Sequence, residues 1–520
     1  MLKFFKSKTF WLSLSIFLTG ASGLIYEYIL STVSSYILGN SIEQFSITIA
    51  LMLFAMGLAG YLQKFISDKN LILKFIGIEI LISILGSFTV IIVYWSYTHL
   101  SNFYLFYYSF AFLIGFLIGL EIPVVLRINQ KYKINLKENI SYIYTADFIG
   151  AFIGALVWVY ILLKYFSILQ IGFIIGSINL IVALITFFIF SKEEEINKTV
   201  GAFILIVSIL ILFLNILGFS YSKKLEAYFQ RALFLDPVIY HKKTPYQDIT
   251  ITKNPKNNEI RLYLNGNLQF SSKDERLYHE LLVHPAIALM DNVQKVLVLG
   301  GGDGLAVREL LKYPNIKITL IELDKEMIKT AMDEPLRNLN ENAFFSDRVK
   351  IIYGDAFTTI DNLEKYSYDL IIIDLPDPSN INLAKLYSYE FYKKIYSLLK
   401  ENGLVAIQGT SPYFSPNTFS CINKTLKNTG FNLIKYHYSI PSFGDWGFFI
   451  AYKHSPTIMN SKLSNFHLKT DNLYFLTEDL FKSSQIFPKN WIKTKNKIEI
   501  NSIFNPVIIK YYKTDNIEGW

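Results

Sequence analysis

The chain has 520 residues, of which 52% are hydrophobic and 18% are charged, and its formal net charge is +8. A composition this apolar excludes an ordinary soluble protein of this length, so part of the chain is expected to lie in a lipid bilayer. Much of the basic excess falls in short loops between apolar segments, which favours membrane orientation over a nucleic-acid partner.

Residues 1–220 are predicted to form an N-terminal all-α transmembrane bundle, which would make the chain a multi-pass protein of the cell membrane. About seven apolar segments approach the roughly 20 residues that a helix needs to cross a bilayer. Small residues recur four positions apart, as in Gly115 and Gly119 or Gly150 and Gly154, which favours close helix packing. The segments lie at 9–30, 43–62, 72–95, 103–126, 140–163, 168–190 and 200–219.

Four acidic residues, Glu27, Glu79, Glu121 and Asp147, fall inside or at the edge of these apolar segments. An ionisable group is costly in a bilayer and marks either a hydrogen bond between helices or a path for a cation. Both interpretations stay open at the level of sequence.

The second half of the chain changes to alternating strands, helices and turns. Residues 221–272 are predicted to form a small antiparallel β module, with a hairpin signal at Asn265-Gly266. Residues 273–455 predict an α/β Rossmann-like (methyltransferase-like) domain with a parallel sheet between helices, and residues 456–520 a C-terminal extension. The single cysteine, Cys421, excludes an internal disulfide.

Acidic residues follow four successive predicted strands of this domain. Because the carboxyl ends of parallel strands meet at one edge of a sheet, these side chains are expected to line one ligand site. A helix cap explains any one of them, but not the whole series. The residues are Asp303, Glu322 with Asp324, Asp355, and Asp374 with Asp377.

The first of these acids lies in the run VLVLGGGDG at 296–304. The run lacks the lysine of a phosphate-binding loop and the G-x-G-x-x-G spacing of a dinucleotide loop. A site lined by carboxylates also repels a pyrophosphate, which argues against NAD. A cationic nucleoside such as S-adenosylmethionine or a relative fits better, with Glu322 on its ribose and Asp355-Ala356 at its adenine.

Several motifs, taken in this order, resemble those of the spermidine synthases, the polyamine aminopropyltransferases. The chain is more similar still to the subgroup with an N-terminal multispan membrane domain, whose first span often resembles SGLIYE at 22–27. The motifs are TPYQDI at 244–249, LNGNLQ at 264–269, DERLYHE at 274–280, GGGDG at 300–304, IELD at 321–324, GDAF at 354–357, DLPDP at 374–378, LYSYEFY at 386–392 and PSFGDWGF at 441–448.

The resemblance implies decarboxylated S-adenosylmethionine as a co-substrate, a diamine such as putrescine as acceptor, and no metal or further cofactor. It implies that the nucleoside is contacted by Gln247, Glu322, Asp355 and Ala356. It further implies that the amines are held by Tyr278, His279, Asp303, Asp374 and Asp377, with Asp374 as the catalytic proton acceptor. Leu375 and Pro376 depart from the small polar pair that is usual between the two aspartates, which leaves the identity of the amine open.

The expected function is therefore aminopropyl transfer at a membrane. The alternatives are a methyltransferase on the same fold, because fold does not fix the reaction, and a polyamine sensor or transporter without turnover. A homo-oligomer is left open. The family's substrates are cytosolic and predict a cytoplasmic catalytic domain, whereas a cytoplasmic N-terminus followed by seven crossings would place that domain outside.

Overall fold

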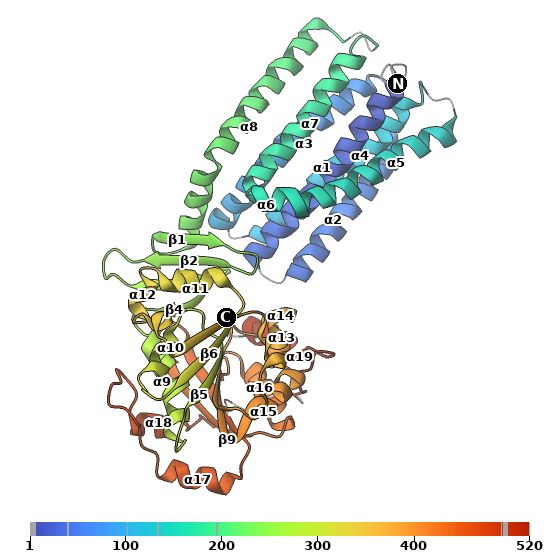
Figure 1. Ribbon diagram of the computed structural model, residues 1–520. Coiled ribbons are helices and arrows are strands. Elements are labelled where there is room, and N and C mark those ends of the chain that lie inside the picture. The colour runs from blue at the N-terminus through green and yellow to red at the C-terminus, as the bar shows by residue number, and fades with distance from the viewer. Residues whose placement is uncertain are drawn as a thin grey trace. The chain divides into compact units, whose positions relative to one another are not determined.

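The computed structural model describes residues 7–38, 41–100, 102–132, 135–193, 196–489, 491 and 498–518. The chain divides into two compact units, Met1–Leu235 and Asp236–Trp520, which we call the helical unit and the catalytic unit (Figure 1).

The helical unit is all-α, as predicted, and the described part of the chain holds seven helical segments long and apolar enough to cross a membrane. A π-helical stretch, Trp158–Leu162, and the short α6, Leu163–Tyr165, extend the fifth of them. The main helices are α1 (Lys8–Leu38), α2 (Ser41–Leu62), α3 (Leu71–His99), α4 (Phe103–Asn129), α5 (Leu136–Val157), α7 (Ile168–Phe190) and α8 (Lys198–Leu233), and a 3-10 turn, Gln63–Phe65, follows α2.

Glycines allow the helices of this unit to approach one another closely. A Cβ at Gly115 would lie 2.9 Å from the Cα of Met52 on α2, and one at Gly154 would lie 2.9 Å from the Cα of Ala21 on α1. Real Cβ atoms do not come this near to backbone, so both positions require glycine. The close packing predicted from the four-residue spacing is confirmed.

Two glutamates are buried in the core of the helical unit. Glu79 on α3 and Glu121 on α4 are 0% and 2% exposed and lie in hydrogen-bond contact with each other. Asn179 on α7 donates from Nδ2 to Glu79 Oε2 at 2.9 Å, and Tyr26 on α1 donates to Asn179 Oδ1 at 3.3 Å. These bonds join four helices, which supports the interhelical role for Glu79.

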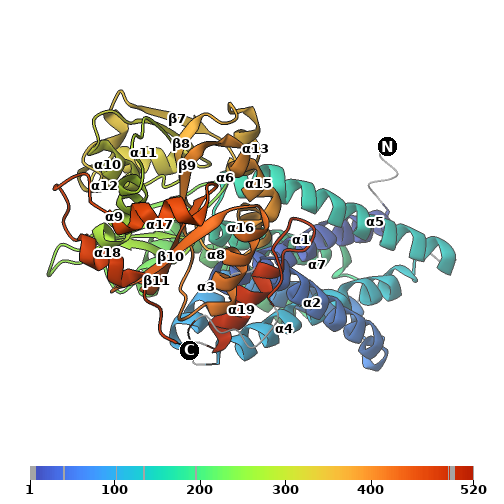
Figure 2. The ribbon, with the colours of Figure 1, turned by 90° about the horizontal axis from the view of Figure 1, so that it is seen from below.

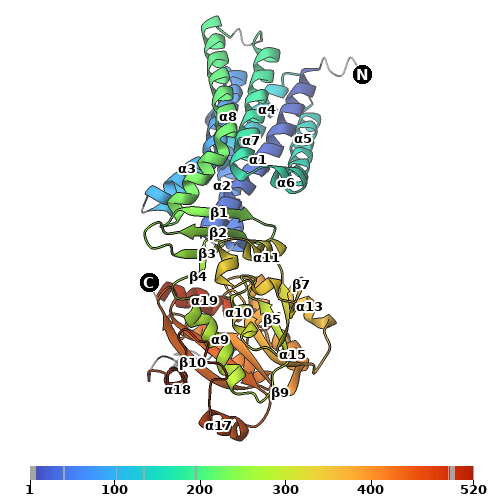
Figure 3. The ribbon, with the colours of Figure 1, turned by 60° about the vertical axis from the view of Figure 1, so that its left-hand side comes forward.

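The catalytic unit begins with a four-stranded antiparallel sheet in the order β1-β2-β3-β4 (Figure 3). Asn265 and Gly266 turn between the last two strands with φ of 52° and 79°, the left-handed values that a two-residue hairpin loop needs. The strands are β1 (Val238–Lys243), β2 (Asp248–Lys253), β3 (Ile260–Leu264) and β4 (Asn267–Ser271).

A seven-stranded sheet follows in the order β10-β11-β9-β8-β5-β6-β7, and it is parallel from β9 to β7. Apolar residues alternate between its two faces: Val296 and Val298 join one core, and Leu297 and Leu299 join the other. The strands are β5 (Lys295–Gly300), β6 (Lys317–Glu322), β7 (Val349–Tyr353), β8 (Tyr368–Asp374), β9 (Leu399–Gln408), β10 (Asn432–Ile440) and β11 (Gly444–Tyr452).

Helices cover both faces of this sheet, so the Rossmann-like expectation is confirmed. The sheet also has an antiparallel edge, β10 with β11, which the sequence prediction of a parallel sheet missed. The helices are α9 (Glu275–Ala288), α10 (Leu305–Leu311), α11 (Lys325–Met332), α12 (Leu336–Leu339), α13 (Ala356–Thr359), α14 (Ile381–Ala384), α15 (Tyr389–Leu398), α16 (Pro416–Asn428), α17 (Pro456–Ser464), α18 (Glu478–Ser484) and α19 (Val507–Glu518), with 3-10 turns η3 (Ala343–Phe345), η4 (Ile360–Asn362) and η5 (Lys385–Tyr387).

The only cysteine, Cys421 on α16, is fully buried, and its Sγ lies 3.4 Å from the carbonyl oxygen of Glu499. Burial raises the pKa of this thiol to about 12.

Candidate active site

Three neighbouring strands, β8, β5 and β6, end beside one another and bring acidic residues to one edge of the sheet. Gly300 at the end of β5 pairs with Asp374 at the end of β8, and β6 ends at Glu322 on the other side of β5. A Cβ at Gly301 would lie 3.1 Å from Asp374 Oδ2, and a Cβ at Gly302 would lie 2.7 Å from Glu322 Oε2. The glycine run thus passes between two carboxyl groups.

The loop from Gly300 to Gly304 has a backbone that side chains would disrupt. Gly300 has a φ of 79°, and a Cβ there would collide with the carbonyl oxygen of Asp374. Asp303 accepts the N–H of Leu305 at its Oδ1 (2.9 Å), and its carbonyl oxygen accepts from Asn340 Nδ2 (2.9 Å). These bonds hold Asp303 at the start of α10, half-buried beside the other acids.

Two acidic residues at the end of β6, Glu322 and Asp324, have different hydrogen-bond partners. Glu322 Oε1 accepts the N–H of Asp324 at 2.9 Å, and burial raises the pKa of Glu322 to about 7. Asp324 Oδ2 accepts from Thr244 Oγ1 at 2.7 Å and from Gln247 Nε2 at 3.1 Å. Asp324 therefore links the predicted residue Gln247 to Glu322 by hydrogen bonds. The sequence analysis did not identify Thr244, which bonds to the same carboxylate.

Asp355 and Ala356 lie where α13 begins, after the next strand, β7. Asp355 Oδ1 accepts the N–H of Phe357 at 2.9 Å as a helix cap, and its other oxygen forms an ion pair with Lys385. Ala356 is buried beside it. Sequence reasoning grouped Asp355 with the other acids, but its charge is compensated within the chain, and no spacing signal points to Lys385.

Tyr278 on α9 bonds directly to Asp374. The Tyr278 hydroxyl donates to Asp374 Oδ1 at 2.7 Å, and Tyr278 is only 8% exposed. Burial and the charge of Asp374 raise the pKa of Tyr278 well above its usual value, so the phenol remains a donor. This bond fixes one oxygen of the half-buried Asp374.

His279, the next residue, belongs to a buried charge network. Its Nδ1 donates to the carbonyl oxygen of Glu275 (2.7 Å) and to Glu275 Oε2 (3.0 Å), and Arg308 binds both oxygens of the same carboxylate at 2.8 and 2.9 Å. Burial alone would lower the pKa of His279, but Glu275 raises it to about 9. The protonated ring then offsets the charge of the nearby Asp303 and Asp374.

Asp377 lies past the end of β8 and has a donor on each carboxyl oxygen. Gln408 Nε2 donates to Oδ1 at 3.4 Å, and the hydroxyl of Tyr512 donates to Oδ2 at 3.1 Å. Burial raises the pKa of Asp377 to about 6, although both bonds act to lower it. Sequence reasoning named neither Gln408 nor Tyr512.

Leu375 and Pro376, between the two aspartates, contribute backbone oxygens to the arrangement. The hydroxyl of Tyr387 donates to the carbonyl oxygens of Leu375 and Pro376 at 3.1 and 3.0 Å, and Gln408 Nε2 donates to that of Leu375 at 2.6 Å. The segment that carries Asp377 is thereby tied to η5 and β9. Tyr387 lies within the motif LYSYEFY, which was the signal that could have identified it.

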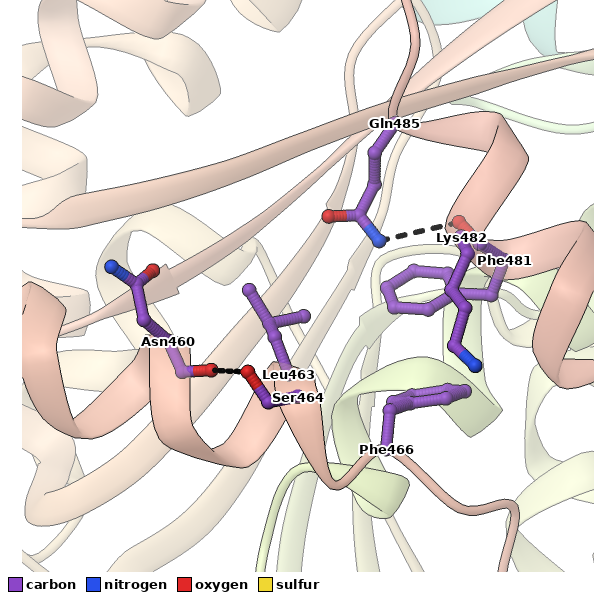
Figure 4. Close-up of a pocket in the computed structure, with 7 residues that line it drawn as sticks. All are labelled: Asn460, Leu463, Ser464, Phe466, Phe481, Lys482 and Gln485. Carbon is purple, nitrogen blue, oxygen red and sulfur yellow. Dashed lines mark hydrogen bonds between the residues drawn. The ribbon is translucent and has the colours of Figure 1, made fainter.

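A depression elsewhere in the catalytic unit lies between α17 and α18 (Figure 4). It has no carboxylate in its lining and shares no residue with the arrangement above. Its lining residues are Asn460, Leu463, Ser464, Phe466, Phe481, Lys482 and Gln485.

The chain is similar to known proteins of one family. The spermine/spermidine synthase domain matches residues 275–462. The polyamine aminopropyltransferase of Leptospira interrogans is 37% identical over 506 residues, which cover 96% of this chain and 97% of that protein. That of Oceanobacillus iheyensis is 35% identical and covers 94% of each chain. A spermidine synthase solved with the transition state analogue AdoDATO aligns with 49% of this chain and 88% of its own at 28% identity, with a TM-score of 0.45.

Proposed function

The chain belongs to the polyamine aminopropyltransferase family, and from this we propose that it is a membrane-bound enzyme that makes spermidine from putrescine. The aminopropyl donor is decarboxylated S-adenosylmethionine, and the second product is 5′-methylthioadenosine. The seven long apolar helices support a location in the cell membrane, where they would contact lipid directly.

The observation that supports the proposal is that Asp303, Glu322 and Asp374 lie together at the glycine loop after β5. A sulfonium nucleoside with a terminal ammonium is a dication, and carboxylates attract it where they would repel a phosphate. Intact S-adenosylmethionine would bring a carboxylate close to Asp303. Like charges in a partly buried site cost several kcal/mol, which selects the decarboxylated donor.

We assign the nucleoside to one side of this site. Glu322 would hold the ribose hydroxyls, and Asp355 and Ala356 would contact the adenine. Gln247 supports the same side through its bond to Asp324. The ion pair of Asp355 with Lys385 suits this assignment, because a neutral purine needs no net negative charge beside it.

The amines would occupy the other side, where Asp303, Asp374 and Asp377 supply negative charge. Tyr278 lines this side and orients Asp374 through their hydrogen bond. His279 balances the charge of the acids in the ligand-free site, and an arriving ammonium group would take over that role.

In the proposed reaction Asp374 is the proton acceptor. An alkylammonium has a pKa of about 10.4, so the acceptor arrives protonated and must lose a proton before its nitrogen can attack. The nitrogen forms a bond to the methylene next to the sulfonium as the C–S bond breaks. The electron pair of the broken bond stays on the sulfur, which becomes a neutral thioether. The released proton passes to the Asp374 carboxylate, so no covalent enzyme intermediate is needed.

Product analysis of the purified full chain tests this proposal. With decarboxylated S-adenosylmethionine and putrescine we expect 5′-methylthioadenosine and spermidine. Formation of S-adenosylhomocysteine from intact S-adenosylmethionine, without 5′-methylthioadenosine from the decarboxylated donor, would instead support a methyltransferase.

Replacing Asp374 by Asn tests the role of the proton acceptor. We expect Asp374→Asn to lower kcat by roughly 10²- to 10⁴-fold, the usual contribution of a general base. Asp291→Asn is the matched control, because the Asp291 side chain is 95% exposed and its carboxylate pairs with Lys462 at the surface. Polyamine uptake that survives Asp374→Asn but is lost in Glu79→Gln would contradict the enzyme proposal and favour a transporter.

A further inference from the structure

The C-terminal segment 498–518 of the catalytic unit lies beyond the matched domain, which ends at residue 462, and packs against α14 and α16. Asn501 is 0% exposed; its Nδ2 donates to the carbonyl oxygen of Ala384 at 2.8 Å, and its own carbonyl oxygen accepts the N–H of Tyr389 at 2.8 Å. These bonds fix the segment against the end of α14 and the start of α15.

Helix α19, at the end of this segment, lies beside α16 (Figure 2). The carboxylate of Asp515 accepts from Thr418 N at 3.0 Å and from Asn417 Nδ2 at 2.6 Å, at the first turn of α16. The buried Asp515 and Ile508 therefore hold both ends of α19 on the catalytic unit.

From this helix Tyr512 extends to Asp377. Its hydroxyl donates to Oδ2, while Gln408 of β9 donates to Oδ1, so two elements that are far apart in the chain orient one carboxylate. The charge of Asp377 acts on two titratable groups, Tyr278 of α9 and Tyr387 of η5, and the charge of Asp374 of β8 acts on the same two tyrosines.

We propose that Tyr512 is a positioning residue for the acceptor amine, and that α19 completes the acceptor side of the site by holding the Asp377 carboxylate in place. This inference rests on the proposed function and deepens it, because it makes the C-terminal extension part of acceptor recognition.

The effect of Tyr512 should be specific to the acceptor. A hydrogen bond from a neutral hydroxyl stabilises the ionised carboxylate, so its removal raises the pKa of Asp377 further above its usual value. Less of Asp377 is then ionised at neutral pH, and the ammonium group binds more weakly. Asp374, Tyr278 and the nucleoside side keep their own bonds, so kcat and donor binding should persist.

The test compares Tyr512→Phe with Tyr511→Phe in the full chain. Tyr511 is the adjacent residue of α19, and its hydroxyl accepts the N–H of Glu499 at 3.1 Å. At about pH 6 we expect the KM for putrescine to rise about fivefold in Tyr512→Phe, with kcat and the donor KM unchanged, since Asp377 is about half ionised there and a hydrogen bond to a charged group is worth about one pKa unit. The difference should shrink as the pH rises and Asp377 ionises, and Tyr511→Phe should behave as the wild type.

A double-variant comparison separates positioning from a general structural effect. In an Asp377→Asn background there is no carboxylate to stabilise, so Tyr512→Phe should add no further rise in KM. A wild-type KM in Tyr512→Phe at every pH, an equal rise in Tyr511→Phe, or a full additional rise in the Asp377→Asn background would each overturn the inference. If the wild type forms no 5′-methylthioadenosine, the proposed function itself fails; if it does, a normal Tyr512→Phe removes only the role of α19.

Discussion

Three half-buried carboxyl groups at the edge of the sheet, those of Asp303, Glu322 and Asp377, have raised pKa values. Burial raises the pKa of Asp303 to about 6, that of Glu322 to about 7 and that of Asp377 to about 6. In the ligand-free protein these carboxyl groups therefore retain protons that isolated carboxyl groups would have lost. Binding of a cationic donor and acceptor requires those protons to leave.

Donor binding is consequently expected to weaken in acid. When the pH falls from about 8 to about 6, Glu322 and then Asp303 take up protons, and the donor KM should rise by roughly tenfold. Steady-state kinetics across this range measures the change, with Glu322→Gln as a control that should already bind weakly and should lose most of the dependence near pH 7. A donor KM that stays constant over the range would contradict the prediction.

The same shifts predict the opposite trend for stability. Because the folded-state pKa values of these acids are raised, their contribution to the free energy of unfolding is fully present below the unfolded-state values and is lost as the pH rises through about 6 to 7. We expect the double variant Asp303→Asn with Glu322→Gln to gain stability relative to the wild type at about pH 8 but not at about pH 5. Thermal unfolding of the ligand-free protein at both pH values checks this.

Arg308 has a structural role, in contrast to the binding role that we propose for the acidic residues. It is 3% exposed and is bonded to Glu275 and Glu309, so its removal leaves two buried carboxylates short of a cation. We expect Arg308→Met to lower the free energy of unfolding by about 3–5 kcal/mol, the usual cost of breaking a buried ion pair. Lys329→Met, which breaks the exposed pair with Glu326, should leave the free energy of unfolding nearly unchanged in the same measurement.

At the scale of elements, the glycine loop after β5 links the sheet to α10 and sets the position of Asp374. We expect Gly300→Ala to lower kcat/KM by about 10²-fold, because a shift of about 1 Å at reacting groups has an effect of that size. Gly266→Ala is the matched control: Gly266 has the same φ of 79°, but its added Cβ would meet nothing within 4 Å. Equal losses in the two variants would show that backbone strain, and not the collision with Asp374, is responsible.

The buried glutamates of α3 and α4 support a second prediction at this scale. Glu79 and Glu121 lie in hydrogen-bond contact, and the Oε1 atom of each finds no hydrogen-bond partner among the described residues. Glu121→Gln supplies an N–H that can donate to Glu79 and should leave the stability of the helical unit unchanged or higher. Glu121→Ala leaves Glu79 short of a partner and should cost about 1–3 kcal/mol in unfolding measurements in detergent.

The sequence predicted the strands of the large sheet wherever a local pattern of residues specified them. Apolar runs that end in an acid located β5, β6, β7 and β8, because a strand buried on both faces leaves a continuous apolar signal. The contacts of Lys385 with Asp355 and of Tyr512 with Asp377 join residues 30 and 135 positions apart, and no periodicity encodes such pairings. The antiparallel β10 and β11 were missed because the prediction placed no strand after the one that corresponds to β9.

At the scale of the whole molecule, the composition of the helical unit determines how the protein should fractionate. The outer faces of its helices carry large apolar side chains such as Phe203, Ile206 and Phe213, all more than half exposed in the isolated chain. We expect the full chain to stay in the membrane pellet through high-salt and alkaline washes and to be released by detergent. Release by high salt alone would show that charge, and not insertion, holds the protein at the membrane.

Because Cys421 is buried, an introduced cysteine can be labelled chemically without removing the native one. Its thiol is both covered and poorly ionised, so a maleimide should leave the wild type unmodified while the fold is intact. A single cysteine introduced at an exposed position, such as Lys69 in the helical unit or Asn257 in the catalytic unit, would then be the only reactive thiol in the chain. Labelling of intact cells with an impermeant reagent would report, position by position, which side of the membrane each loop faces, and would show whether the catalytic unit faces the cytoplasm.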